Sequence, residues 1–145
     1  MFVLTDNDVS RVPAAVAVDA ARQALIQLGR GELAAPTRAR CELGELDYVI
    51  TAGALADGTS GFRAYRAGEP AGQQLVAVWD RQGNLTGIVV GDELGALRTG
   101  ALGAVAADVL APPDADADAA TIIGTGRQAW TQPRTTPPQA TWSPN

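Results

Sequence analysis

The sequence predicts an α/β fold of the α+β kind, in which antiparallel β strands carry packed helices and a glycine turn follows them. Three observations support this fold class. Apolar or alternating segments follow one another between residues 46 and 90, with no helical segment between them. Segments with helical spacing of apolar residues flank this run, at 14–28 and 94–110. The third is Ile-Ile-Gly-Thr-Gly-Arg-Gln-Ala at 122–129, which indicates a strand end, a tight turn and a helix start.

The chain is expected to open with a short strand and a helix. Residues 2–4, Phe-Val-Leu, predict the strand, and Thr5 or Asp6 can cap the segment after it. Glycines at 29 and 31 then predict the helix end, so the helix is expected at about 14–28. Its expected apolar stripe, at helical spacing, is Val16, Ala20, Ala24 and Leu28.

The middle of the chain predicts a succession of strands. Leu46–Ile50 is one candidate strand, and the apolar run Leu75–Trp79 predicts a more buried one. Gly61–Arg66 alternates aromatic and basic residues as a half-buried strand does. The segment Asp80–Asn84 is rich in turn residues. We therefore expect Leu85–Val90 to return beside the preceding strand as a hairpin.

A second helix is expected to follow the hairpin, with Asp92 as its cap. Ala and Gly on its other face predict close packing. The expected apolar stripe of this second helix is Leu94, Leu97, Leu102, Val105, Val109 and Leu110.

The prolines and alternating aspartates of 112–118 indicate a solvated linker, so a new domain is expected near Ala119.

The segment after this linker carries the glycine turn of a dinucleotide-binding fold. Ala120–Ile123 is apolar and rich in β-branched residues, which predicts the strand before the turn. Gly124 allows the tight turn, Gly126 lets the backbone approach a pyrophosphate, and Ala129 takes the small position where helix and strand pack. Such a turn works inside a βαβ unit with an acidic residue about 20 positions further on for the ribose. No such residue follows within these 145 residues.

Composition excludes several classes of function. Without His and with Cys41 as the only cysteine, the chain cannot build a Ser-His-Asp unit, a His metal site or an internal disulfide. All 11 basic residues are Arg and the net charge is −5, which argues against a nucleic-acid surface. The sequence has no apolar run of the roughly 18 residues that a membrane span needs, and no secretion signal. We therefore expect a cytoplasmic protein with no metal, nucleic-acid or membrane partner.

Several separated motifs together resemble the ornithine cyclodeaminase and mu-crystallin family. The most specific part is Leu-Arg-Thr-Gly-Ala at 97–101, followed further along the chain by Gly-Thr-Gly-Arg-Gln. The resemblance covers roughly residues 2–132. Its other elements are Leu4-Thr5 with Asp8-Val9, Pro36-Thr37-Arg38, Gly61-Phe62-Arg63 and the hairpin that ends in Gly83.

The resemblance implies a two-domain enzyme about twice this length, of which this chain is an N-terminal fragment. Residues 1–112 would form part of an antiparallel β domain that binds substrate and makes a homodimer. Residues 113–132 would be the linker and the start of a truncated NAD(P)-binding Rossmann domain, with only its first strand and glycine turn. Residues 133–145, rich in Pro, Thr and Ser, predict a disordered tail that has no counterpart in the family.

The resemblance also assigns candidate site residues. Arg38, Arg63 and Arg98 match positions that contact the substrate carboxylate, which a planar guanidinium can hold bidentately. Arg40 is a close competitor of Arg38, and a solvated role is the alternative for Arg63 and Arg98. Many members have a Lys in place of Arg63, so this chain lacks that titratable amine. The expected contacts of NAD or NADP are Gln74, Arg98, Thr99, Gly124, Gly126, Arg127 and Gln128.

The expected function is that of an ornithine cyclodeaminase-like, NAD(P)-dependent amino-acid deaminase or imine reductase, a lyase or an oxidoreductase, present here as a truncated and inactive fragment. Its substrate would be a small amino acid or imine, which the sequence does not specify further. No residue matches the family's catalytic Asp, so no catalytic residue is assigned. The alternatives are a non-catalytic module that dimerises or binds a small ligand, and a pseudogene product without function.

Overall fold

The computed structural model describes residues 1–68, 73–110, 122–126, 128–129 and 131. The chain divides into two compact units. We call Met1–Arg11 with Ala24–Leu94 the strand unit, and Val12–Gln23 with Gly95–Asn145 the helical unit. The linker at 112–118 and the tail at 133–145 lie outside the described residues, so the expected domain boundaries stay predictions.

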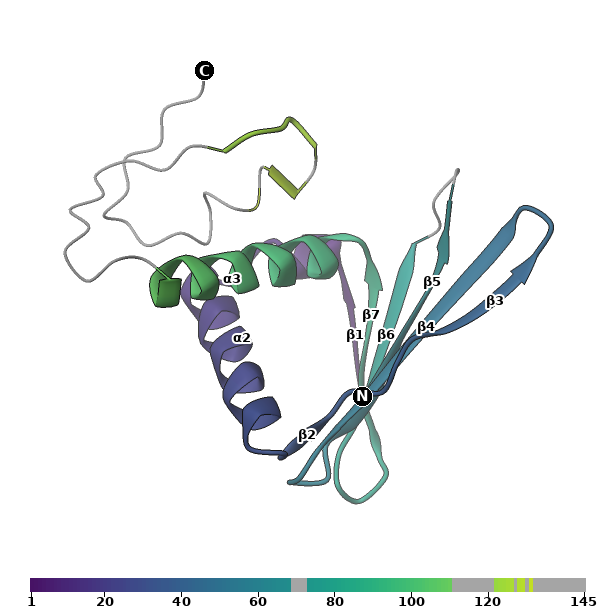
Figure 1. Ribbon diagram of the computed structural model, residues 1–145. Helices are drawn as coiled ribbons and strands as arrows, with labels where there is room; N and C mark the ends of the chain where they lie inside the picture. The colour runs from purple at the N-terminus through teal and green to yellow at the C-terminus, as the bar shows by residue number, and fades with distance from the viewer. Residues whose placement is uncertain (69–72, 111–121, 127, 130, 132–145) are drawn as a thin grey trace. The chain divides into compact units, whose positions relative to one another are not determined.

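The strand unit is built on one seven-stranded sheet, with strand order β1-β7-β6-β5-β4-β2 and β3 also paired with β4 (Figure 1). Neighbouring strands are antiparallel except β1 and β7, which are parallel. Parallel neighbours need a long connection, and almost the whole strand unit lies between these two strands in the sequence. The strands are β1 Phe2–Thr5, β2 Leu33–Ala34, β3 Ala39–Leu43, β4 Leu46–Leu55, β5 Ser60–Ala67, β6 Gln74–Trp79 and β7 Leu85–Gly91.

All strands predicted between residues 2 and 90 are confirmed, whereas β2 and β3 were missed. Both lie along the same edge of β4, where Ala34 pairs with Ala54 and Ala39 pairs with Ile50. Four residues (35–38) separate Ala34 from Ala39 on this edge, whereas three (51–53) separate Ile50 from Ala54 on β4. Pro36 lies in this gap and has no N–H to donate to the ladder, which suits an interrupted edge strand. The alternation of Ala, Cys and Leu with charged residues over 39–43 was the available sequence signal.

Hydrogen bonds accepted by the Asp80 carboxylate form the predicted turn between β6 and β7. The Asp80 Oδ1 atom accepts from the backbone N–H groups of Gln82 and Asn84, both at 2.9 Å. These bonds hold the pKa of the Asp80 carboxyl below its ordinary value, with the Asn84 side chain making the largest contribution. Gly83 has a φ of 81°, which favours glycine. The turn is therefore specified by its own side chains.

A contact between residues distant in sequence marks the start of α3 (Glu93–Leu110), the helix that was predicted to follow the hairpin. It begins directly after the expected cap Asp92. The backbone N–H of Glu93 donates to Asp6 Oδ1 at 2.9 Å. Gly91 precedes it with a φ of 136°, and a Cβ added there would lie 2.0 Å from the same oxygen. Any other residue at this end of β7 would be strained by this φ and would have to displace the Asp6 carboxylate. Asp6 itself begins α1 (Asp6–Val9), where the Thr5 N–H and hydroxyl both donate to Asp8 Oδ2 at 2.9 Å.

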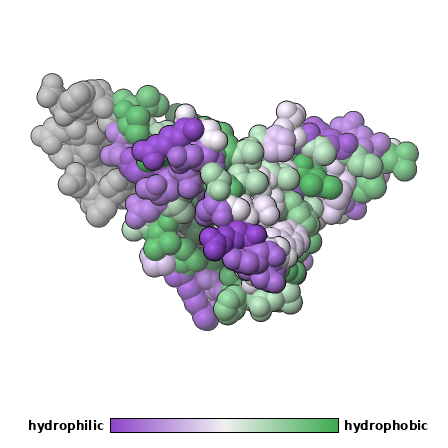
Figure 2. All heavy atoms as spheres, turned by 90° about the horizontal axis from the view of Figure 1, so that it is seen from below, coloured by the Kyte–Doolittle hydropathy of each residue, from purple (hydrophilic) through white to green (hydrophobic). Residues whose placement is uncertain are grey.

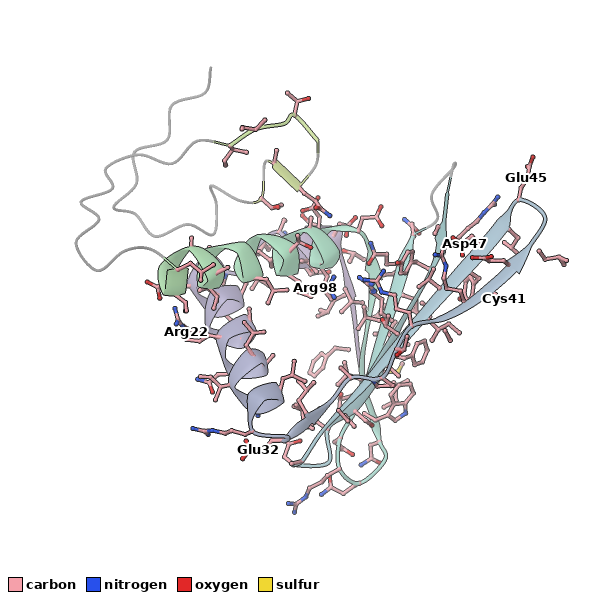
Figure 3. The ribbon with its side chains drawn as sticks, viewed as in Figure 1. Arg22, Glu32, Cys41, Glu45, Asp47 and Arg98 are labelled. Atoms are coloured by element: carbon pink, nitrogen blue, oxygen red, sulfur yellow. The ribbon has the colours of Figure 1, made fainter. Side chains whose placement is uncertain are left out.

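The helical unit packs through small side chains. Helix α2 (Ala14–Gly29) confirms the predicted helix, and its Ala21 forms a core with Ala101 and Val105 of α3. The expected stripes were wrong at several positions, which are exposed: Val16 (56%), Ala20 and Leu28 (50%) in α2, and Leu102 (37%), Val109 (68%) and Leu110 (80%) in α3. A helix rich in Ala presents more than one apolar stripe, and periodicity alone does not choose among them. An ion pair of 2.7 Å between Arg22, labelled in Figure 3, and Asp108 also joins the two helices.

The expected strand Ala120–Ile123 is not present where the structure describes it. Ile122 and Ile123 belong to no strand, and Ile123 is 97% exposed. A strand needs hydrogen bonds to a neighbour, and none of the described strands pairs with these residues. Over the described part of the chain, no helix combines the length and the apolar character that crossing a membrane requires.

Candidate functional site

The candidate carboxylate site lies on one face of the strand unit, which we call the site face. Alternate residues of a strand point to the same face, and residues paired across strands share it. Thr51 on β4 pairs with Arg63 on β5, and Arg63 pairs with Val76 on β6. Two residues along β5, Tyr65 pairs with Val49. The β5–β6 register, continued by one step, places Gln74 beside Tyr65.

Arg63 is held by neighbours on this face. Its guanidinium carbon lies 4.8 Å from the centre of the Tyr65 ring, within the range of a cation–π contact. Its Nη1 donates to Gln74 Oε1 at 3.5 Å, a long hydrogen bond. The Nε atom is buried and the whole residue is half-buried. The guanidinium therefore packs against the sheet, and Gln74, expected as a cofactor contact, is a neighbour of Arg63.

Arg38 lies close to the same region of the sheet but is exposed. It precedes Ala39, whose partner on β4 is Ile50, so its nearest register position on β4 is Thr51. Thr51 pairs on its other side with Arg63. The two arginines are therefore two strand spacings apart, about 10 Å between backbones. Within the described ranges, no side chain forms a hydrogen bond or ion pair with Arg38.

Arg40, the competitor of Arg38, already has carboxylate partners. Its guanidinium pairs with Asp47 through Nε and Nη2, and its Nε lies 3.4 Å from Glu42 Oε1. The Asp47 carboxylate raises the pKa of Arg40 above its ordinary value. Figure 3 shows Asp47 on the β3–β4 hairpin. Because Arg40 is engaged by its own hairpin, the geometry favours Arg38 as the residue available to a ligand.

The remaining candidate residues belong to the helical unit. Arg98 is exposed on α3 (Figure 3), and the Thr99 hydroxyl donates to the Gly95 carbonyl at 2.9 Å. The structure therefore brings Arg63 and Gln74 together in the strand unit. A shared cavity for Arg38, Arg63 and Arg98 stays a prediction.

The glycine turn fits a dinucleotide only in part. Gly124 has a φ of 127°, and open space surrounds the Cβ positions of Gly124 and Gly126. Ala129 N–H donates to the Gly126 carbonyl at 2.9 Å, and Gln128 is exposed. Arg127 lies outside the described residues. The paired, buried strand that orients such a turn is missing over Ile122–Ile123, so the described residues do not complete a cofactor site.

Sequence reasoning missed the contact between Tyr65 and Arg63. It lies two residues after Arg63, and this spacing on a strand puts both side chains on one face. The alternation of Gly61–Arg66 was used to predict the strand but not to pair these two side chains. Their contact became visible only in the three-dimensional structure.

Comparison with protein families identifies the class of protein. Residues 63–139 match the profile of the ornithine cyclodeaminase/mu-crystallin family. The match covers more than half of the chain, and the chain belongs to this family. The resemblance predicted from the sequence motifs is thereby confirmed. No curated protein sequence matches the chain significantly.

Solved structures share the fold. An iminosuccinate reductase of Paracoccus denitrificans in complex with NAD+ superposes with a TM-score of 0.82 at 24% identity, covering 92% of this chain and 44% of that one. A probable ornithine cyclodeaminase from Bordetella pertussis gives 0.81 at 22%, covering 91% and 43%. A lysine cyclodeaminase that recognises L-lysine, L-ornithine and L-2,4-diaminobutyric acid gives 0.70 at 30%, covering 93% and 46%. The chain spans less than half the length of each.

Proposed function

We propose that this chain supplies the carboxylate-binding sheet of an NAD(P)-dependent amino-acid deaminase or imine reductase. The observation that carries the proposal is the placement of Arg63, whose guanidinium packs on Tyr65 and donates to Gln74. Arg38 lies beyond Thr51 on the same part of the sheet and is exposed to a ligand. Family membership supports the reaction class, because the solved structures with this fold include cyclodeaminases and an NAD+-bound reductase.

The chemistry of the proposed site is the recognition of a small amino acid or imine through its carboxylate. Hydrogen bonds from a guanidinium to a carboxylate are charge-assisted and about twice as strong as neutral ones. Arg63 can take this role with little reorganisation because its side chain already packs on the sheet. Arg98 is the third proposed contact. Hydride exchange with NAD or NADP is the reaction of such enzymes, and we assign none of its steps to the described residues.

The test is a titration of the 145-residue chain with L-alanine, L-proline and L-ornithine, followed by two-dimensional NMR. We expect millimolar binding of at least one of them, and at least about tenfold weaker binding by Arg63→Gln, because one charge-assisted pair is lost. The matched control is Arg30→Gln, whose side chain is exposed in the same unit. Equal binding by both variants, or no binding by the unchanged chain, would contradict the proposal.

Turnover is tested separately, by following NADH oxidation with cyclic imines and NAD reduction with amino acids. We expect these 145 residues to bind substrate without turnover, because the described residues do not complete the cofactor site. Steady turnover with either dinucleotide would show that the glycine turn is functional as it stands.

The opposite face of the sheet favours a second candidate, a dimerising module. We call it the apolar face: Leu46, Tyr48 and Ile50 of β4 are 42%, 39% and 40% exposed, and Leu43 of β3 is 78% exposed. Figure 2 shows hydrophobic residues at the β3–β4 end of the sheet, beside hydrophilic ones. Exposed apolar patches commonly mark protein interfaces. The occupant we propose is a second copy of the chain, as expected for this family.

Sedimentation velocity tests this second candidate. We expect a dimer that Ile50→Asp converts to monomer, because a charge would be buried without a partner. A dimer that binds no carboxylate would favour the non-catalytic module over the enzyme. A chain without far-UV circular dichroism typical of folded protein would support the remaining alternative, a pseudogene product.

A further inference from the structure

We infer that Tyr65 is a positioning residue that fixes the guanidinium of Arg63 for a ligand carboxylate. The inference rests on the proposed function, because it concerns how the same site holds its substrate. The reason lies in the geometry of β5, where Arg63 and Tyr65 are two residues apart and share the site face. The distance of 4.8 Å from guanidinium carbon to ring centre is within the roughly 6 Å limit for this contact.

The Tyr65 ring is itself held by the sheet. Its partner on β4 is Val49, which is only 3% exposed, although Tyr48 and Ile50 on either side of it face the other way and are exposed. Val49 therefore lies beneath side chains of the site face, and Tyr65 is its paired neighbour. A ring packed in this way cannot turn freely, so it offers Arg63 a fixed surface.

A fixed guanidinium binds a carboxylate more tightly than a mobile one. An arginine side chain loses rotamer freedom when it is ordered. This entropy cost lowers affinity when the side chain becomes ordered only on binding. Stacking on Tyr65 and the hydrogen bond to Gln74 order Arg63 beforehand. Tyr65 acts through Arg63, so its effect should appear as affinity for carboxylate ligands.

The same geometry distinguishes Arg63 from a lysine. The planar guanidinium can lie against an aromatic ring and still offer N–H groups at its edge, whereas an ammonium is a compact point charge on a flexible stem. Arg63 and Tyr65 thus form a matched pair in this chain. Replacing Arg63 by Lys would keep the charge and lose the stacked fork, so Tyr65 would no longer contribute to orientation.

The experiment observes Arg63 directly by NMR of its Nε–Hε group in the 145-residue chain. The Tyr65 ring current should displace the Arg63 signal from that of the exposed Arg30, and Arg63→Gln assigns the signal. We expect Tyr65→Phe to keep the displacement, because the ring remains. Tyr65→Leu should remove it and weaken L-proline binding by about two- to fivefold, the range of one partly exposed cation–π contact. In Arg63→Lys, the further change Tyr65→Leu should have little effect on binding.

The inference needs both effects of Tyr65→Leu and normal binding by Tyr65→Phe. It is overturned if the Arg63 signal does not move, or if it moves while the affinity for L-proline stays the same. Tyr65→Val, which suits a strand, replaces the Leu variant if that variant does not fold. If the unchanged chain binds no carboxylate, the proposed function fails, and with it the role of Tyr65 in binding. The Arg63 signal then still reports whether the ring orients the guanidinium.

Discussion

The strand unit and the helical unit place their candidate residues in different ways. In the strand unit, Arg63 contacts Tyr65 on its own strand and Gln74 on the neighbouring one, and a continuous hydrogen-bonded ladder positions both. In the helical unit, Arg98 is exposed on α3 and the glycine turn follows residues that belong to no strand. The comparison supports the proposal that the described sheet recognises a carboxylate, whereas the described residues do not complete a dinucleotide site. In experiment, we therefore expect the chain to bind carboxylates without binding a dinucleotide.

The largest effect is expected at Gly91, the last residue of β7, shortly before α3 begins. Gly91→Ala should lower the free energy of unfolding by about 3 kcal/mol, from a strained positive φ and from overlap with Asp6. Urea denaturation followed by circular dichroism measures the loss. The matched control is Gly87→Ala, whose added Cβ would meet the Phe2 carbonyl at 3.7 Å, an ordinary contact. Equal losses in the two variants would show that the Asp6 contact does not matter.

A smaller loss is expected in the core of the helical unit. Ala101 is fully buried between α2 and α3, so Ala101→Leu should overpack it and lower the free energy of unfolding by about 2 kcal/mol. Ala106→Leu, at an exposed position of the same helix, should change it by less than about 0.5 kcal/mol. The L-proline affinity of the strand unit should survive the Ala101 change in protein that remains folded. Its loss would show that the two units are coupled more tightly than the comparison implies.

A pH-dependent effect is expected at the exposed turn of Asp80. The folded pKa of this carboxyl lies below its ordinary value of 3.8, because Asn84 and Gln82 donate to the ionised form. Its stabilising contribution is therefore present above pH 3.8 and is lost as the pH falls through the folded pKa. Asp80→Asn should lower Tm slightly at pH 7, and the difference should shrink towards pH 3. A difference that grows on acidification would contradict this sign.

The last prediction is that dinucleotides do not bind measurably. Calorimetric titration with NADH and with NADPH should show no micromolar binding, since Ile123 is 97% exposed where a cofactor domain needs a paired strand. The same sample should bind L-proline, which serves as an internal positive control. Micromolar affinity for either dinucleotide would break the proposed separation of the two halves.

Local sequence signals predicted most of the strand unit. Alternation and turn chemistry are properties of neighbouring residues, so β4 to β7 and the Asp80 turn were found from the sequence. The edge strands β2 and β3 were missed because they are short and are defined by pairing with β4, far along the chain. The strand expected at Ala120–Ile123 failed for the related reason that apolar, β-branched residues favour a strand but do not provide its partner.

The site residues also divide into those that the sequence predicted and those that only the structure revealed. Motifs alone determined the family, the arginines at 38, 63 and 98 as candidates, and the glycines at 124 and 126. Only the tertiary structure showed that Asp47 forms an ion pair with Arg40 and that Tyr65 and Gln74 contact Arg63. It also showed that the Asp6 carboxylate caps α3 beside Gly91. Residue type and spacing along the chain determine which local structures form. Which side chains become neighbours depends on strand register and on contacts between distant segments, and these are settled when the sheet assembles.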